Sequence, residues 1–136
     1  MDSHDSLHVL VVEADPRTRD LLRVGLDSFA NFEVESVEPR WAADRVMERS
    51  FHLVLVNLEI PDGIDGLDIV QEIREVDPRP EFILLTKGRS SRFLSSQKNA
   101  HNIFAFLTLP LDVAAFFKTI ARARDRINEK VPVARV

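Results

Sequence analysis

The feature that most constrains the fold is a short, uninterrupted apolar run, Leu53-Val54-Leu55-Val56, which ends at Asn57. A run of this length between turn residues predicts a strand that is buried on both faces, as in a parallel sheet covered by helices. Asn57 therefore lies at the carboxyl end of the predicted strand. In open α/β sheets, ligands bind at that end of the strands. We expect the functional site to be built around Asn57.

Four further segments have the composition of strands, and helical patterns separate them. The strands are expected at 7–12, 32–37, 81–86 and 104–109, and the helices at 16–29, 41–49, 67–76, 92–100 and 113–130. This alternation predicts βαβ units with right-handed crossovers and a parallel sheet. We predict a three-layer, flavodoxin-like (βα)5 fold with a five-stranded parallel sheet in the order 2-1-3-4-5.

Length and composition favour one cytoplasmic domain. The 136 residues match the size of an average domain. We expect a disordered start at 1–6, the folded domain at 7–130, and a tail or the start of a linker at 131–136. The absence of cysteine excludes disulfides and thiolate chemistry. No apolar run approaches the roughly 18 residues of a membrane span, so no membrane partner is expected.

The charges are segregated along the chain. Residues 1–86 carry 8 Lys and Arg against 19 Asp and Glu, whereas residues 87–136 carry 10 against 3. A solvated surface with favourable helix-dipole pairing accounts for this pattern. The alternative is a basic docking face for an acidic partner. We do not expect nucleic-acid binding through the basic third, because the basic residues are not interleaved with a recognition element.

Four sequence blocks resemble the receiver domain of two-component response regulators. They are VLVVEADPRTRDLL, LVLVNLEIPDGIDGLDIV, FILLT and FLTLP, in that order, and the likeness covers about residues 7–126. The resemblance implies a domain that takes a phosphoryl group from a histidine kinase onto an aspartate ending the third strand. It also implies an acidic pair that holds Mg²⁺ with that aspartate. A Thr or Ser and a Lys, ending strands four and five, would bind the phosphoryl oxygens.

The residues at these positions depart from the family pattern. The phospho-acceptor position is Asn57, and an amide cannot form an acyl phosphate. The acidic pair falls on Glu13 and Ala14, which leaves Glu13 and the following Asp15 as the carboxylates of this pocket. The lysine position is Leu109. Three losses at one site argue against a single engineered or deamidation-prone substitution, so we predict a degenerate pseudo-receiver.

The family's switch positions are retained in part. Thr86 ends the fourth strand, and Phe106 takes the place of the aromatic switch residue in the fifth. Thr86 could equally satisfy only local backbone groups. The loop from Pro61 to Gly66 is one residue longer than is usual for the family. We expect no catalytic residue and no enzymatic activity, no cofactor, and weak or absent Mg²⁺ binding.

Other polar clusters have simpler explanations. Asp62, Asp65 and Asp68 lack the further oxygens of a calcium loop and are interpreted as turn and helix-start residues. The four histidines share no zinc-ligand spacing. Neither a phosphate-binding GxxxxGK loop nor a GxSxG nucleophile elbow is present.

Two functions remain open. The first is a phosphorylation-independent receiver that binds a kinase, an output domain, a scaffold or a second copy through its fourth helix, fifth strand and fifth helix. The candidate interface residues are Arg92, Phe93, Lys118, Arg122 and Arg126. Five phenylalanines fall in this region, and not all are expected to point inward: Phe93, Phe104, Phe106, Phe116 and Phe117. The second is a non-covalent phosphate or small-ligand sensor that uses the crevice near Glu13, Asn57 and Thr86.

Overall fold

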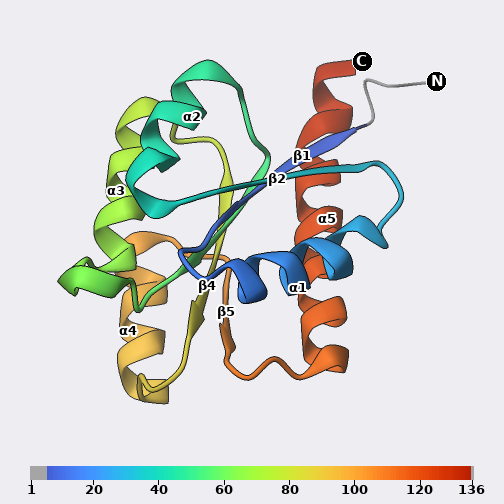
Figure 1. The fold of residues 1–136 in the computed structure, drawn as a ribbon. Helices are drawn as coiled ribbons and strands as arrows, with labels where there is room; N and C mark the ends of the chain where they lie inside the picture. The colour runs from blue at the N-terminus through green and yellow to red at the C-terminus, as the bar shows by residue number, and fades with distance from the viewer. Residues whose placement is uncertain (1–5, 136) are drawn as a thin grey trace.

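A computed structural model describes residues 6–135, with the side chains of residues 6–130, and has a parallel sheet between two helical layers (Figure 1). The strands are β1 (Leu7–Val12), β2 (Phe32–Val37), β3 (Leu53–Asn57), β4 (Glu81–Thr86) and β5 (Ala105–Thr108). Their order is β2-β1-β3-β4-β5, and all neighbours are parallel. The predicted flavodoxin-like topology is confirmed.

The helices cover both faces of the sheet. They are α1 (Pro16–Asp27), α2 (Ala42–Glu48), α3 (Gly66–Val76), α4 (Ser91–His101) and α5 (Val113–Arg135), with short 3₁₀ turns at Pro39–Trp41 and Pro61–Gly63. Figure 1 shows α2, α3 and α4 on one face and α1 and α5 on the other. None of these helices is long and apolar enough to cross a membrane.

The chain ends differ from the prediction in one respect. Helix α5 continues to Arg135, beyond the end expected near Lys130. The sequence after Lys130 contains no glycine that could form a C-cap, and the helix continues through Pro132. The expected tail at 131–136 is therefore helical through Arg135. The expected disordered start at 1–6 lies outside the described residues, apart from Ser6.

Short polar side chains set the starts of the helices. Asp15 accepts a hydrogen bond from Thr18 N, Asp65 from Leu67 N and Ser90 from Phe93 N. Asp112 accepts one from Ala115 N in the same way (3.2 Å). Each cap satisfies a backbone N–H that has no partner within its helix. The helix starts predicted at residues 16 and 113 are thereby confirmed.

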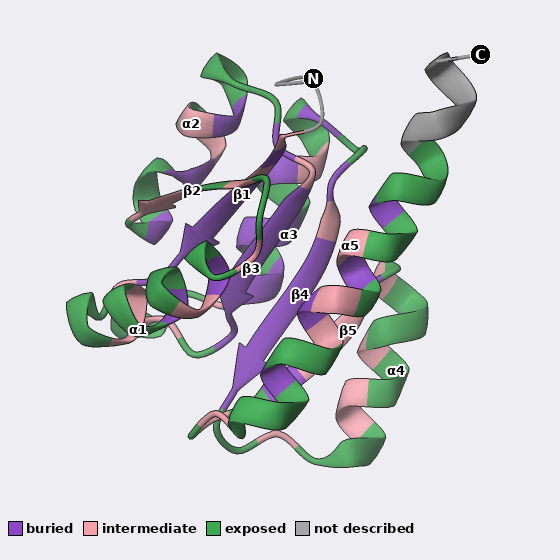
Figure 2. Cartoon of the chain, turned by 90° about the vertical axis from the view of Figure 1, so that its right-hand side faces the viewer, coloured by how far each residue is buried: buried purple, intermediate pink, exposed green. Residues whose placement is uncertain are grey.

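The central strands are buried on both faces. Side chains of β3 alternate between the two layers: Val54 and Val56 pack toward α2, α3 and α4, and Leu53 and Leu55 toward α1 and α5. Figure 2 shows the buried strands at the centre and exposed outer helix faces. In α1, Leu22 and Leu26 are buried against the sheet, whereas Leu21 is 61% exposed. Leu21 lies next to Leu22 in sequence and faces away from the sheet.

A histidine pair lies at the edge of the sheet opposite the carboxyl ends of the strands. His8 N donates a hydrogen bond to His52 Nδ1 (3.0 Å), and the two rings stack with centroids 5.9 Å apart. Burial lowers the pKa of His52 below its ordinary value, and the positive charges of His8 and Arg79 lower it further. A protonated Nδ1 could not accept the bond from His8, so the folded state favours neutral His52.

This arrangement predicts a pH-dependent stability. Because the pKa of His52 is lower in the folded than in the unfolded state, the unfolded state binds more protons, and stability falls as the pH drops through the unfolded value of about 6.5. Denaturant unfolding between about pH 7.5 and about pH 5.5 should show this loss. The slope should flatten in His52→Gln, which keeps an acceptor without titrating. The control is His101→Gln on α4. Equal slopes in all three chains would contradict the role of His52.

Candidate functional site

The carboxyl ends of β1, β3, β4 and β5 bring the candidate site residues to one edge of the sheet. Asn57 ends β3 and is paired with Leu85 of β4, and Thr86 ends β4 beside Thr108. Glu13 follows β1 directly, and Leu109 follows β5. Glu13 and Asn57 are 3% and 7% exposed, and Thr86 is fully buried. The structure therefore brings Glu13, Asn57 and Thr86 together at one edge of the sheet.

Asn57 is held by hydrogen bonds at both ends of its amide. Its Nδ2 donates to Glu13 Oε1 (2.9 Å), and its Oδ1 accepts from Glu59 N (3.0 Å). The two partners fix the orientation of the amide, because a flipped amide would place its oxygen against a carboxylate and its NH₂ against a donor. The side chain at the acceptor position is a bridge between β1 and the loop after β3, and it offers no nucleophile.

Glu13 is the remaining carboxylate of the predicted acidic pocket, and both of its oxygens have donors. Oε1 accepts from Asn57, and Oε2 accepts from Asp15 N (3.0 Å). Arg19 also donates to the backbone oxygen of Glu13 (3.2 Å). Ala14 brings no oxygen from its side chain to this pocket.

Asp15 does not belong to the pocket with Glu13, contrary to our expectation. Its carboxylate is exposed and accepts from both the backbone N (3.0 Å) and the hydroxyl of Thr18 (2.8 Å). The hydrogen bond from the Thr18 hydroxyl is the main cause of the lowered pKa of Asp15. Asp15 caps α1 because its backbone is extended and its side chain turns toward the helix.

These residues do not fit the Mg²⁺ ion that receivers hold. Mg²⁺ needs carboxylates that keep oxygens free for it. Here Glu13 is the carboxylate bonded to the Asn57 side chain, and both of its oxygens already accept hydrogen bonds from the protein. Within residues 6–130, no group of three or more His, Cys, Asp or Glu could hold a metal ion.

Thr86 is bonded to a residue that the sequence did not single out. Its hydroxyl donates to Glu59 Oε2 (2.7 Å), and Lys87 N donates to Glu59 Oε1 (2.7 Å). Arg89 Nε lies 3.3 Å from Glu59 Oε2. The sequence held one indication of this contact, namely an acidic residue two positions after Asn57 combined with a basic loop after the fourth strand. The contact itself forms because the ends of β3 and β4 lie side by side in the sheet.

The side chains at the aromatic switch position and at the lysine position pack on the two hydrophobic cores of the domain. Phe106 is half-buried and packs on the layer of α2, α3 and α4. Leu109 packs on the layer of α1 and α5, and its backbone N donates to Thr86 O (2.8 Å). The lysine position therefore contributes apolar packing where receivers place an ammonium group.

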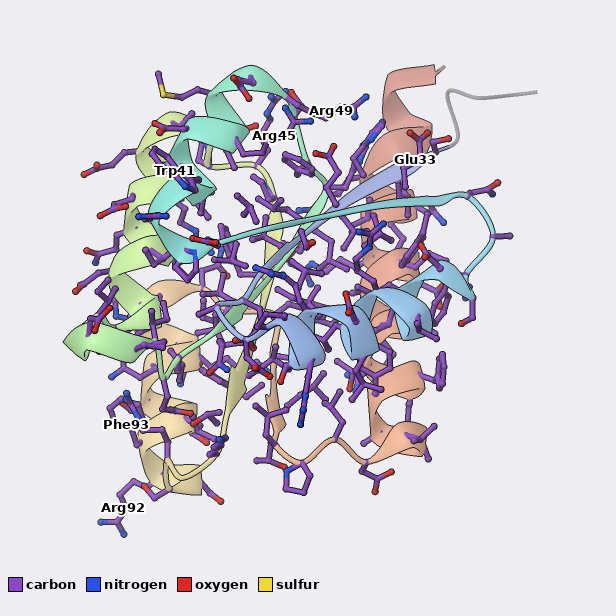
Figure 3. The ribbon with its side chains drawn as sticks, in the orientation of Figure 1. Glu33, Trp41, Arg45, Arg49, Arg92 and Phe93 are labelled. Carbon is purple, nitrogen blue, oxygen red and sulfur yellow. The ribbon has the colours of Figure 1, made fainter. Side chains whose placement is uncertain are left out.

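The predicted interface residues differ in their solvent exposure and in their contacts with other side chains. Arg92 is exposed and extends away from the fold (Figure 3), whereas the half-buried Phe93 lies under Arg89, whose guanidinium carbon is 4.9 Å from the ring centroid. Arg126 pairs with Glu81 (3.2 Å). Lys118 and Arg122 are exposed and form no ion pair with another residue in the described part of the chain.

The expectation that not all five phenylalanines point inward is met by Phe117, and the other four rings are buried or half-buried. Of the five phenylalanines, Phe116 is buried and Phe93, Phe104 and Phe106 are half-buried. Phe117 is exposed by 37%, and its ring lies 5.8 Å from that of Phe29, next to α1. The rings fill the space between the sheet and its helices, so the face presents mainly basic and polar side chains.

The aspartates of the loop after β3 have structural roles, as predicted. Asp65 caps α3, and Asp68 lies in the first turn of that helix. Asp62 is in the left-handed region with φ of 69° within the 3₁₀ turn. Glu59 and Asp65 form an isolated antiparallel bridge, which closes the loop.

Comparison with known proteins gives a consistent result. The sequence model described as "Response regulator receiver domain" matches residues 9–121. The transcriptional regulatory protein GlrR of Escherichia coli (strain K12) is 31% identical over 126 residues, which are 91% of this chain. ResD of Bacillus subtilis (strain 168) is 32% identical over 93 residues, 67% of this chain. The chain spans 28% of the length of GlrR and 38% of that of ResD.

Solved structures share the fold. The signal receiver domain of an HD domain-containing protein from Pseudomonas fluorescens Pf-5 superposes with a TM-score of 0.79 at 18% identity, covering 93% of this chain and 92% of that chain. The chemotaxis protein CheY4 of Vibrio cholerae gives a TM-score of 0.75 at 21% identity, covering 87% and 98%. At these identities the likeness establishes the fold alone.

Gly66 allows α3 to begin directly against the site. A Cβ at this position would lie 2.5 Å from Asn57 O and 2.7 Å from Leu58 Cα, which are backbone atoms that cannot rotate away. We therefore expect Gly66→Ala to lower the free energy of unfolding by about 2 to 3 kcal/mol through overpacking. Denaturant titration measures this change.

The matched control is Gly88→Ala. A Cβ at Gly88 meets nothing within 4 Å. Its effect should stay within about 0.5 kcal/mol. Similar losses in the two variants would show that the close approach of α3 to Asn57 carries no special constraint.

Proposed function

The chain belongs to the response regulator receiver domain family of two-component signalling, and on that premise we propose that it is a phosphorylation-independent receiver that acts as a protein interaction module. One observation carries the proposal. The side chain at the acceptor position is the amide of Asn57, and both of its ends are engaged, with Glu13 and with the backbone of Glu59. A phosphoryl group has no carboxylate to attach to at this position.

Two neighbouring positions support the proposal. Phosphoryl transfer depends on metal ions and cationic side chains that neutralise the transferred group. Ala14 removes one metal ligand, and Leu109 replaces the ammonium group with an apolar side chain that packs on the α1 and α5 layer. With these groups lost together, the domain is not expected to be an enzyme or to depend on Mg²⁺.

The alternative of a phosphate or small-ligand sensor receives less support. A sensing crevice would need free donors, yet the hydroxyl of Thr86 and the amide of Lys87 both donate to Glu59. Glu13 and Asn57 are bonded to each other. An external anion would have to displace an internal carboxylate before it could bind.

A basic hollow marks the candidate partner face. It has a volume of about 350 Å³, lies between α4 and α5, and is lined by Lys98, Arg122 and Arg126 together with Glu81. Basic side chains in a concave surface attract acidic partners and raise the rate of encounter. We expect the partner, which is a kinase, an output domain, a scaffold or a second copy, to present an acidic segment here.

The first test is phosphorylation itself. Incubation with acetyl phosphate and Mg²⁺, or with an autophosphorylated histidine kinase, should leave the intact mass of the chain unchanged. A receiver that keeps its aspartate serves as the positive control in the same reactions. Stoichiometric phosphorylation on any residue of this chain would refute phosphorylation independence.

A second test addresses the partner face. After in-cell cross-linking identifies the partner, the affinity of the purified pair is measured for Lys118→Glu/Arg122→Glu. We expect a loss of about tenfold or more at low salt, because reversed charges repel an acidic segment. Arg126 is left unchanged, because a glutamate there would face Glu81.

The matched control reverses two exposed basic residues outside the α4 and α5 face, Arg17→Glu/Arg23→Glu on α1. We expect the affinity to change by less than about twofold, since these charges do not line the hollow between α4 and α5. Equal losses in both double variants would point to net charge alone, and the α4 and α5 face would be rejected.

A further inference from the structure

A carboxylate of the chain itself occupies the anion-binding end of the crevice. We propose that Glu59 is an internal anion ligand for an oxyanion site, defined here as the Thr86 hydroxyl, the Lys87 backbone N–H and the Arg89 guanidinium. Emptied of Glu59, this site would bind a small oxyanion such as inorganic phosphate. The inference deepens the proposed function and rests on it, because in a receiver that is not phosphorylated another anion must accept the hydrogen bonds of these donors.

The geometry is that of a bound anion. Each carboxylate oxygen of Glu59 accepts one hydrogen bond of 2.7 Å, from Thr86 Oγ1 and from Lys87 N, and Arg89 adds a guanidinium at 3.3 Å. Such convergent donors bind carboxylate and phosphate oxygens alike. Thr86 is fully buried, so its hydroxyl requires an acceptor. Glu59 supplies it.

The backbone holds Glu59 in place for this contact. Glu59 N donates to Asn57 Oδ1 (3.0 Å), and Glu59 forms the isolated bridge with Asp65. The residue is therefore fixed on both sides before its side chain reaches across to β4. A tethered ligand of this kind has a high effective concentration at its site.

The contact extends into the proposed partner face. Arg89 bonds Glu59 and also covers the ring of Phe93. Phe93 N in turn donates to Ser90 Oγ (3.1 Å), the cap of α4. Glu59 thus holds the loop at 87–90 and the first turn of α4 in one arrangement, and removing it should release both.

The test uses amide NMR on the unsubstituted chain and on Glu59→Ala, each titrated with sodium phosphate and, separately, sodium acetate at constant ionic strength. Glu59→Ala alone should shift the amides of Thr86, Lys87, Arg89 and Phe93. Phosphate should then bind this variant at least about tenfold more tightly than the unsubstituted chain, in which Glu59 must first leave. Acetate should partly restore the original shifts.

Two controls define the site. Glu72→Ala removes an exposed carboxylate from α3 and should leave the phosphate response of the unsubstituted chain unchanged. Glu59→Ala/Thr86→Ala lacks the hydroxyl donor and should lose the tighter binding. If Glu59→Ala does not fold, Glu59→Gln retains one acceptor oxygen and should show the same shifts with smaller amplitude.

Two results would overturn the inference. One is that the amides of Lys87 and Phe93 stay in place when Glu59 is removed. The other is that phosphate binds the unsubstituted chain and Glu59→Ala equally well. Neither result involves covalent modification, so failure here is distinct from failure of the proposed function, which the mass measurement alone decides.

Discussion

The buried hydrogen bond between Asn57 and Glu13 is the contact on which the rest of the site depends. Glu13 directly follows β1 and is only 3% exposed, and a buried carboxylate requires donors for its oxygens. The neutral amide of Asn57 provides one at 2.9 Å, and the start of α1 provides the other through Asp15 N. An aspartate in place of Asn57 would bring two negative charges together and would need a cation between them. The amide removes that need.

A second carboxylate is neutralised in the same internal manner. Glu59 has donors from Thr86, Lys87 and Arg89, all on the far side of the crevice. The two bonded groups are linked, because Asn57 accepts from the backbone of Glu59. The negative charges of Glu13 and Glu59 in the crevice are therefore satisfied by donors within the chain. These contacts connect β1, β3 and β4 to the loop before α4. Such a connection suits a domain whose surface is held in one state.

The surface reflects the charge segregation of the sequence only in part. Several basic residues of the last third find acidic partners from the first two thirds, as Arg126 and Lys130 do at Glu81. Lys118 and Arg122 do not, within the described residues, and they face solvent near the hollow between α4 and α5. The set of basic residues without an ion pair in the described part of the chain is thus smaller than the sequence suggested, and it includes Arg92 and Lys98 of α4 as well as Lys118 and Arg122 of α5.

The sequence by itself determined the topology, the helix starts at Asp15 and Asp112, and the gathering of Glu13, Asn57 and Thr86 at one sheet edge. These features follow from periodicity, capping chemistry and the rule that parallel strands end together. Only the tertiary structure decided that the Asp15 carboxylate turns away from Glu13, that the phenylalanines mostly turn inward, and that Glu59 meets Thr86. Those outcomes depend on side-chain directions in loops and on partners distant in sequence, 27 residues apart for Glu59 and Thr86. No local pattern encodes such a distance, because it exists only once β3 and β4 are paired.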